Sequence, residues 1–79
     1  MKTQTQTFKG TTYPAWHGSP FDRGSADSWY SRGQDPHYWP QGTYKGKRVE
    51  AQDMTLAEMR EYYAGYEHNE ECGGKKEWD

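Results

Sequence analysis

The chain of 79 residues has few aliphatic side chains, with one Leu, one Val and no Ile against 4 Trp, 7 Tyr and 2 Phe. A core built from this inventory must be aromatic, so the hydroxyl and indole N–H groups at its edge need partners or water. A chain of this length buries only about 60% of the surface of its unfolded form. We therefore expect one small domain with a narrow stability margin.

Cysteine is also scarce, and the first residues lack an apolar leader. A single Cys, Cys72, excludes an internal disulfide and is typical of a reducing compartment. Residues 1–10 lack the apolar segment of a signal peptide, and no run of the chain approaches a membrane span. We expect a cytoplasmic protein with no membrane contact.

Positive charge is not in excess, because the formal net charge is −2. The chain as a whole is therefore not a general polyanion binder. The charge is unevenly distributed, since residues 41–52 are weakly basic and residues 53–79 are clearly acidic. A basic middle beside an acidic C-terminal part predicts two different surfaces.

Residues 53–72 carry the clearest local pattern. Thr55 is a good N-cap, and Glu58 three residues later completes a capping box. Apolar side chains then recur at three- and four-residue steps, and two glycines follow the stretch. These apolar residues are Leu56, Met59, Tyr62, Tyr63 and Tyr66. We predict a helix over residues 55–72, with its tyrosines in the core and an acidic outer face.

An earlier helix is predicted to begin at Ser19-Pro20, with Ser as the cap and Pro at the first helical position, and to run to about Arg32. Its inward row would be Phe21, Gly24, Ser25, Ser28, Trp29 and Arg32. Glycine inside a helix costs about 1 kcal/mol relative to alanine. Gly24 and Gly65 therefore favour two antiparallel helices that cross closely at these glycines.

The segment between the helices is rich in turns and aromatics. Pro36 and Pro40 bracket His37-Tyr38-Trp39, which excludes a helix or a central strand there. This aromatic loop either packs over the helices or forms a contact surface. Residues 43–49 could form a tight hairpin about Lys45-Gly46, anchored by Tyr44 and Val49.

The ends of the chain are predicted to lie outside the domain. Residues 1–12 alternate Thr and Gln without an apolar face, so we expect a flexible N-terminal arm. Residues 13–72 form the domain, and residues 73–79 form a C-terminal tail whose Trp78 could dock back. The predicted fold class is mainly α: a small two-helix domain with an aromatic loop and a possible short β-hairpin between the helices.

Metal binding is weakly indicated. His68 and Cys72 would share a helical face, and His17 and His37 could complete a four-ligand zinc site. The spacing matches no zinc module, however, and solvated histidines are the simpler interpretation. We expect no metal and no other cofactor.

Catalysis is not indicated either. Cys72 with His68 could act as nucleophile and base, or Glu58 with Glu61 as a carboxylate pair. The acidic C-terminal end of a helix raises the pKa of a thiol, however, which opposes nucleophilic activation. We expect a non-enzymatic protein without a small-molecule substrate.

A direct contact with RNA or with a protein partner is the stronger hypothesis. Cations next to aromatic rings suit phosphate contacts and stacking on unpaired bases. The same residue types anchor protein interfaces. The candidate contact residues are Arg23, Arg32, His37, Tyr38, Trp39, Tyr44, Lys45, Lys47 and Arg48.

Several short phrases resemble the ribosome modulation factor family. These are Arg23-Gly24, then Pro36-His37-Tyr38, then Tyr62-Tyr63-Ala64-Gly65-Tyr66. The family has an Arg-Gly pair in a first helix, a Cys-Pro-Tyr after it and a Trp-x-Gly-Gly-Trp pattern in a second helix. Its members bind the small ribosomal subunit and favour inactive ribosome dimers, so the resemblance implies a ribosomal partner.

The resemblance covers roughly residues 21–70. Asp35 stands where the family has Cys, Tyr62 and Tyr66 stand where it has Trp, and the linker here is longer. The chain also resembles short proteins of tailed-phage and prophage genomes that share the phrases FDRGSADSWY and PHYW.

The combined prediction is a phage-type accessory protein that binds a host macromolecule in the cytoplasm. The ribosome or its RNA is the first candidate partner. The alternative is a protein-directed inhibitor of a host nuclease, polymerase or defence complex, acting through an aromatic and acidic surface.

Overall fold

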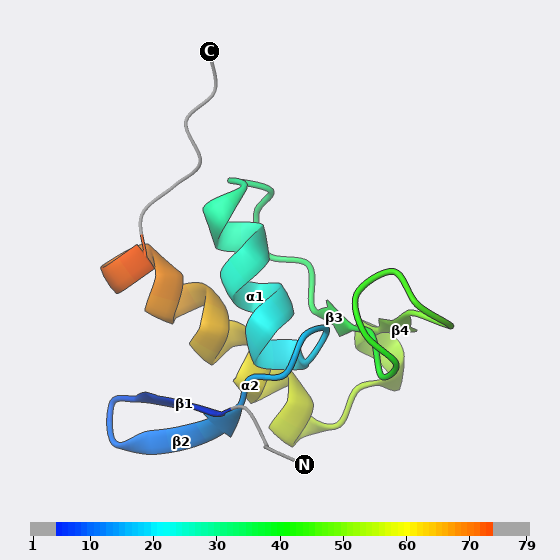
Figure 1. Ribbon diagram of the computed structural model, residues 1–79, viewed down its shortest axis with the longest axis horizontal. Helices are drawn as coiled ribbons and strands as arrows, with labels where there is room; N and C mark the ends of the chain where they lie inside the picture. Colours follow the sequence, from blue (N-terminus) through cyan, green and yellow to red (C-terminus); the bar gives the residue numbers. More distant parts are fainter. Residues whose placement is uncertain (1–4, 74–79) are drawn as a thin grey trace.

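A computed structural model describes residues 5–73, apart from the side chain of Cys72. The prediction of a mainly α fold is wrong, because the described chain is a small mixed domain of two helices and two small antiparallel sheets. Figure 1 shows the two sheets on opposite sides of the helix pair. The elements are β1 (Thr5–Phe8), β2 (Thr11–Pro14), α1 (Pro20–Trp29), β3 (His37–Tyr38), β4 (Val49–Glu50), the 3-10 helix η1 (Ala51–Asp53), α2 (Leu56–His68) and the π-helical turn η2 (Asn69–Gly73).

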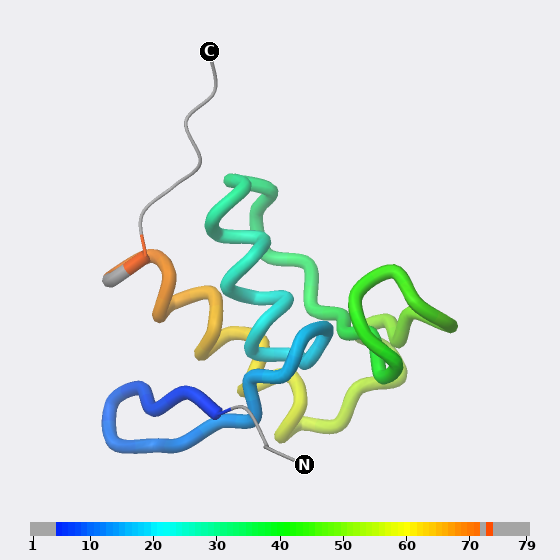
Figure 2. Tube along the Cα trace, viewed as in Figure 1, coloured from blue at the N-terminus to red at the C-terminus, as the bar shows by residue number. Residues whose placement is uncertain are grey.

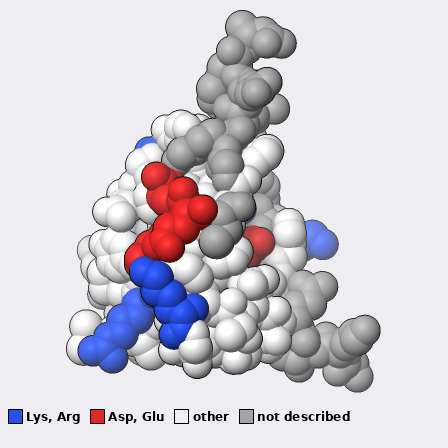
Figure 3. Space-filling view, turned by 90° about the vertical axis from the view of Figure 1, so that its left-hand side faces the viewer, with Lys and Arg blue, Asp and Glu red and all other residues white. Residues whose placement is uncertain are grey.

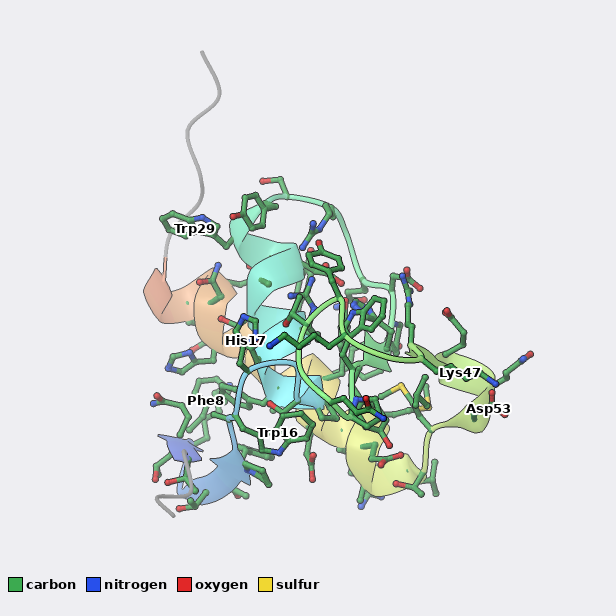
Figure 4. All side chains as sticks on the ribbon, turned by 45° about the vertical axis from the view of Figure 1, so that its right-hand side comes forward. Phe8, Trp16, His17, Trp29, Lys47 and Asp53 are labelled. Atoms are coloured by element: carbon green, nitrogen blue, oxygen red, sulfur yellow. The ribbon has the colours of Figure 1, made fainter. Side chains whose placement is uncertain are left out.

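Helix α1 begins as predicted and ends earlier. The Ser19 side chain accepts a hydrogen bond from the Asp22 amide, and Pro20 occupies the first turn. The helix ends at Trp29, before the predicted limit at Arg32. Trp29 lies at the far end of α1 and is 39% exposed, so it is not part of the inward row (Figure 4).

The buried face of α1 is rotated relative to the prediction. Phe21, Gly24 and Ser28 are buried as expected, whereas Ser25 is only half-buried. Arg23 and Asp27 are buried in addition. This rotation directs one side of α1 toward the loop that follows it, where these two charged residues find their partners.

Helix α2 confirms the predicted capping box. The Thr55 hydroxyl accepts from the Glu58 amide at 3.1 Å, and the Glu58 carboxylate accepts from the Thr55 amide at 2.8 Å. The helix ends at His68, and η2 continues it as a π-helical turn. Of the tyrosines predicted to face the core, Tyr62 is fully buried, whereas Tyr63 is exposed.

The two helices cross at their glycines, as predicted. A Cβ at Gly24 would lie 2.0 Å from the Tyr62 carbonyl oxygen, and a Cβ at Gly65 would lie 2.0 Å from the Phe21 carbonyl oxygen. Only glycine permits this approach of the two backbones. Each helix therefore lacks a side chain at the point where the backbone of the other helix packs against it.

The predicted antiparallel direction is wrong. Ser28, near the C-terminal end of α1, donates to Glu70 at 2.5 Å and accepts from Asn69 at 2.9 Å, and both partners follow the end of α2. The two C-terminal ends therefore lie side by side, and both helices rise together in Figure 1.

The described part of the predicted N-terminal arm is a β-hairpin. Thr5 pairs with Pro14 and Phe8 with Thr11, so Lys9-Gly10 forms the two-residue turn. Both turn residues have positive φ, 51° and 80°, which is typical of a type I′ hairpin turn. The prediction of a flexible arm is therefore wrong for residues 5–12, and residues 1–4 lie outside the described chain.

The hairpin packs against the crossed helices through aromatic contacts. The Phe8 ring lies 5.2 Å from the His68 ring in an edge-to-face arrangement, and Tyr13 stacks on Phe21 at 5.2 Å. Phe8, Phe21 and Ala64 form the buried hydrophobic cluster. The core is thus aromatic, as the composition predicts, and it is completed by the hairpin.

An ion pair joins the hairpin turn to the end of α2. The Lys9 ammonium lies 2.6 Å from Glu67 and 3.2 Å from Glu71. These carboxylates raise the pKa of Lys9, while the Lys9 hydrogen bond is the main cause that lowers the pKa of Glu67. Figure 3 shows the acidic strip on this face with basic side chains at its lower end.

The second sheet differs from the predicted hairpin over residues 43–49. Its strands are β3 and β4, with Tyr38 opposite Val49 and His37 opposite Glu50. Residues 39–48 form the loop between them, which Figure 2 traces on the side of α1 away from the N-terminal hairpin. The His37–Tyr38 strand is short and has a single partner, which is compatible with the flanking prolines.

Among residues 5–73, no helix has both the length and the apolar character that a membrane crossing requires. The predicted tail from residue 74 onward, including the docking of Trp78, lies outside the described chain.

Candidate functional site

A pocket of about 380 Å³ lies between α1 and the chain that follows it as far as Arg48. It contains most of the predicted contact residues, brought together from α1, β3 and the loop. The lining residues are Arg23, Asp27, Arg32, Asp35, His37, Trp39, Tyr44 and Arg48.

Three predicted contact residues lie outside the pocket. Tyr38, next to His37 on β3, points the other way, and its hydroxyl is hydrogen-bonded to Glu58, which together with burial raises the pKa of Tyr38. Lys45 and Lys47 are exposed on the loop. Figure 4 shows Lys47 at the outer end of the loop, near Asp53.

Asp27 is a pocket residue that the sequence analysis missed. Its side chain is buried in α1, where it accepts from the Tyr62 hydroxyl and, at 3.0 Å, from the Arg32 Nε. Burial is the first cause and the Asp27 hydrogen bond the second cause of the strongly raised pKa of Tyr62. An aspartate in a helix usually faces solvent, so no pattern in the sequence indicated this burial.

Asp35 is the second lining residue that was missed, and it joins α2 to Arg48. Its amide donates to the Tyr62 hydroxyl at 2.8 Å, and its carboxylate accepts from Arg48 at 2.8 Å. The Arg48 Nε lies 3.0 Å from Glu50, an ion pair without hydrogen-bond geometry. Arg48 is therefore balanced by the carboxylates of Asp35 and Glu50.

His37 is held in one neutral tautomer by its neighbours. The Arg23 Nε donates to His37 Nε2 at 3.3 Å, and an arginine can only donate. The Nε2 atom must therefore be the unprotonated nitrogen. The Nδ1 atom carries the hydrogen and donates to the Asp35 carbonyl oxygen at 2.6 Å. The imidazole thus serves as an acceptor that orients the guanidinium of Arg23.

Arg23 differs from the other two arginines of the pocket. It is only 7% exposed, and it hydrogen-bonds His37 and, at 3.4 Å, the Thr43 hydroxyl, which are both neutral. Among the described residues, no carboxylate lies within 4.0 Å of its guanidinium. A buried cation without an opposite charge is costly to the fold.

The aromatic part of the pocket is formed by Trp39 and Tyr44. Their rings meet edge to face at 5.5 Å, and the Arg23 guanidinium lies 5.7 Å from the centre of the Tyr44 ring. Tyr44 is 72% exposed and has a φ of 64°, which is unusual for a bulky residue. The Trp39 indole Nε1 is buried and has no acceptor in the described part of the chain.

The histidines considered as metal ligands do not converge. His37 bonds Arg23 and Asp35, His68 packs between Phe8 and Phe21, and His17 is exposed. Within residues 5–73, no group of three or more His, Cys, Asp or Glu side chains could hold a metal ion. The ligand and nucleophile roles that were considered and not favoured for Cys72 fall on a side chain outside the described part of the chain.

The arrangement suits the binding of an anion next to a ring. Arginine donors, an exposed tyrosine and a tryptophan meet in one cavity, and two of the three arginines are balanced by aspartates. A guanidinium presents paired N–H groups that match phosphate or carboxylate oxygens. The surplus positive charge of the pocket is at Arg23.

Compared with protein-family models, curated proteins and solved structures, the chain has no significant match. The resemblance to the ribosome modulation factor family therefore stays a prediction.

Proposed function

We propose that this chain is a small non-enzymatic accessory protein that binds single-stranded RNA in the cytoplasm, with the ribosome of a phage host as the first candidate partner. The observation that carries the proposal is the meeting of Arg23, Arg32 and Arg48 with Trp39 and Tyr44 around one pocket. Unpaired bases stack on aromatic rings while arginines contact the phosphates beside them.

The distribution of charge around the pocket supports this proposal. Lys45 and Lys47 are exposed on the same loop and extend the basic surface beyond the pocket. The acidic end of α2 lies on the other side of α1 from this loop (Figure 1). An RNA strand on the loop therefore stays away from the carboxylates that gather at this end of α2.

The test is the salt dependence of binding to a single-stranded oligoribonucleotide. Because cations release counterions from RNA phosphates, the affinity should fall steeply as salt rises. We expect the double variant Lys45→Ala/Lys47→Ala to reduce the slope of log affinity against log salt by about 1.4, at about 0.7 per lost phosphate contact. Fluorescence anisotropy over a salt series measures this slope.

Arg60→Ala is the matched control, because Arg60 is an exposed cation of α2 outside the pocket. It should leave the slope unchanged. Absence of binding to RNA and to isolated ribosomal subunits at low salt would refute the proposal. A loss of about 0.7 for the single charge removed in the control would show that any surface cation counts, which also contradicts a role for the loop.

A protein-directed inhibitor remains the second candidate, and the exposed aromatic rings favour it. Trp29 and Tyr63 are both large and exposed, and neither lines the pocket. Aromatic anchors of this kind are typical of protein interfaces. A host protein that is retained at high salt, and is lost with Trp29→Ala but not with Lys45→Ala/Lys47→Ala, would favour this function over RNA binding.

A further inference from the structure

We propose that the pocket is a binding site for a nucleoside monophosphate, with the phosphate on Arg23 and the base on the exposed ring of Tyr44. The inference rests on the proposed function, because it names the part of an RNA chain that the pocket would hold. It also covers a free nucleotide, which presents the same phosphate and base.

The first support is the charge of Arg23. The guanidinium is buried next to a neutral imidazole, a hydroxyl and a tyrosine ring, and no described carboxylate lies within 4.0 Å of it. Asp27, one turn further along α1, is occupied by Arg32 and Tyr62. An anion that enters the pocket therefore meets one cation that the fold leaves unbalanced.

The second support is the orientation of that cation. A guanidinium has five N–H donors, and His37 and Thr43 accept from two of them. Because the Nε hydrogen bond fixes the plane of the group, its remaining donors are held in place before a ligand arrives. Paired donors of this kind favour the oxygens of a phosphate.

The third support is the backbone of Tyr44. A left-handed conformation is unfavourable for a residue with a Cβ, and glycine would adopt it without that cost. The fold nevertheless holds a largely exposed tyrosine there, beside Trp39 and over Arg23. Strained residues of this kind concentrate at binding sites, and an exposed ring beside a phosphate site is a stacking surface for a base.

The fourth support is size. The volume of 380 Å³ is near the lower limit of ordinary ligand pockets, which begin at about 300 Å³. It fits one nucleotide and excludes a duplex. The pocket therefore binds a single unpaired nucleotide, either at the end of an RNA strand or free in solution.

The primary experiment compares AMP, inorganic phosphate and adenosine by NMR titration of the full chain. We expect AMP to bind most tightly and to shift the signals of Arg23, His37 and Tyr44. Inorganic phosphate should shift the Arg23 and His37 signals more weakly, and adenosine should bind at least tenfold more weakly than AMP. Adenosine binding as tightly as AMP, or an AMP titration that leaves the pocket signals unshifted, would overturn the proposal.

Two variants separate the phosphate site from the base site. Arg23→Gln should weaken both AMP and phosphate by at least tenfold, because it removes the one described pocket cation that no described carboxylate balances. Tyr44→Gly should weaken AMP by about tenfold through the loss of stacking, while phosphate binding stays unchanged. Phosphate binding that survives in Arg23→Gln would contradict the assignment.

Ser31→Gly is the matched control for Tyr44→Gly. Ser31 also has a positive φ, 57°, and it lies outside the pocket, so its replacement by glycine relieves the same backbone cost. Both glycine variants should melt at or above the temperature of the parent chain, and only Tyr44→Gly should lose AMP affinity. If Arg23→Gln does not fold, this pair still decides the proposal.

A short oligoribonucleotide with a 5′-phosphate or a 5′-hydroxyl end distinguishes the two sources of the ligand. Tighter binding of the phosphorylated end than of AMP assigns the pocket to an RNA terminus, and equal binding of AMP assigns it to a free nucleotide. RNA that binds while AMP does not would refute the pocket and leave the proposed function standing. If AMP binds while no RNA binds at low salt, the pocket assignment stands and the proposed function is refuted.

Discussion

At the scale of single residues, the fold depends on one hydroxyl that belongs to Tyr62. This side chain is 0% exposed, donates to Asp27 of α1 and accepts from the amide of Asp35 in the loop. It therefore connects α2 to two residues that line the pocket, Asp27 and Asp35. Its removal leaves the buried carboxylate of Asp27 and the part-buried amide of Asp35 each with one hydrogen-bond partner fewer.

We predict that Tyr62→Phe lowers the free energy of unfolding by about 1–3 kcal/mol, the usual cost of an unsatisfied buried polar group. Thermal or urea denaturation followed by circular dichroism measures the loss. Tyr63→Phe is the control, because Tyr63 is adjacent, exposed and in edge contact with Tyr62. Equal stability of the two variants would mean that the Asp27 hydrogen bond contributes nothing.

The chemistry of the pocket was partly predictable at this scale. Arginines next to Trp and Tyr in a basic segment indicated a contact surface, and Arg23, Trp39 and Tyr44 do line the cavity. The aspartates were not predictable, because a carboxylate is normally solvated and its burial here depends on partners far away in the sequence.

At the scale of the elements, the close crossing of α1 and α2 sets where the pocket forms. Gly24 faces the backbone of α2 and Gly65 faces the backbone of α1. The carbonyl oxygens that a side chain would meet belong to the other helix, so neither can move aside without moving its helix. The crossing at these glycines therefore sets the position of Arg23, next to Gly24, and of Asp27, about one turn later in α1.

Gly65→Ala tests this crossing. Alanine is favoured over glycine in a helix by about 1 kcal/mol. The added Cβ would lie 2.0 Å from the Phe21 carbonyl oxygen, so we expect a net loss of stability of about 2 kcal/mol. Chemical denaturation measures it, with Arg60→Ala on the exposed face of α2 as the control. A more stable Gly65→Ala would show that the helices do not approach at this point.

The direction and the inner face of α1 were not predictable from the element alone. The small residues Gly24, Ser25 and Ser28 permit a parallel or an antiparallel neighbour, because sequence spacing defines a face and not a partner. The hydrogen bonds of Ser28 to Glu70 and Asn69 show which ends lie together.

At the scale of the whole molecule, the N-terminal hairpin is part of the folded domain. It covers Phe21 and His68, which the two helices alone would leave open to water. A domain with so few aliphatic residues needs these additional aromatic contacts. Without the hairpin, its core would consist only of the interface between the two helices.

We therefore predict that Phe8→Ala destabilises the whole domain by about 3 kcal/mol, as expected for a buried Phe. A flexible arm would show no such loss. Thermal denaturation measures the effect, and Thr5→Ala, on an exposed position of the same strand, is the control. Unchanged stability of Phe8→Ala would mean that the hairpin does not dock in solution.

Local chemistry in the sequence determined the helix starts, the capping box at Thr55 and the glycine contact between the helices, because these depend on neighbours within a few residues or on a side chain that only glycine lacks. The aromatic character of the core followed from the scarcity of Leu, Val and Ile. The sequence also contained the Lys9-Gly10 turn, but alternating Thr and Gln beside one Phe did not indicate a buried strand face.

Only the tertiary structure decided the hairpin docking, the common direction of the helices and the burial of Asp27 and Arg23. Each of these depends on a contact between groups that are distant in the sequence. Phe8 packs against His68, Ser28 donates to Glu70, and Asp27 accepts from Tyr62. A short polar strand or a buried charge is unfavourable by itself and becomes stable when its partner is in place. This is why the scarcity of Leu, Val and Ile predicted which side chains form the core and not which segments contribute them.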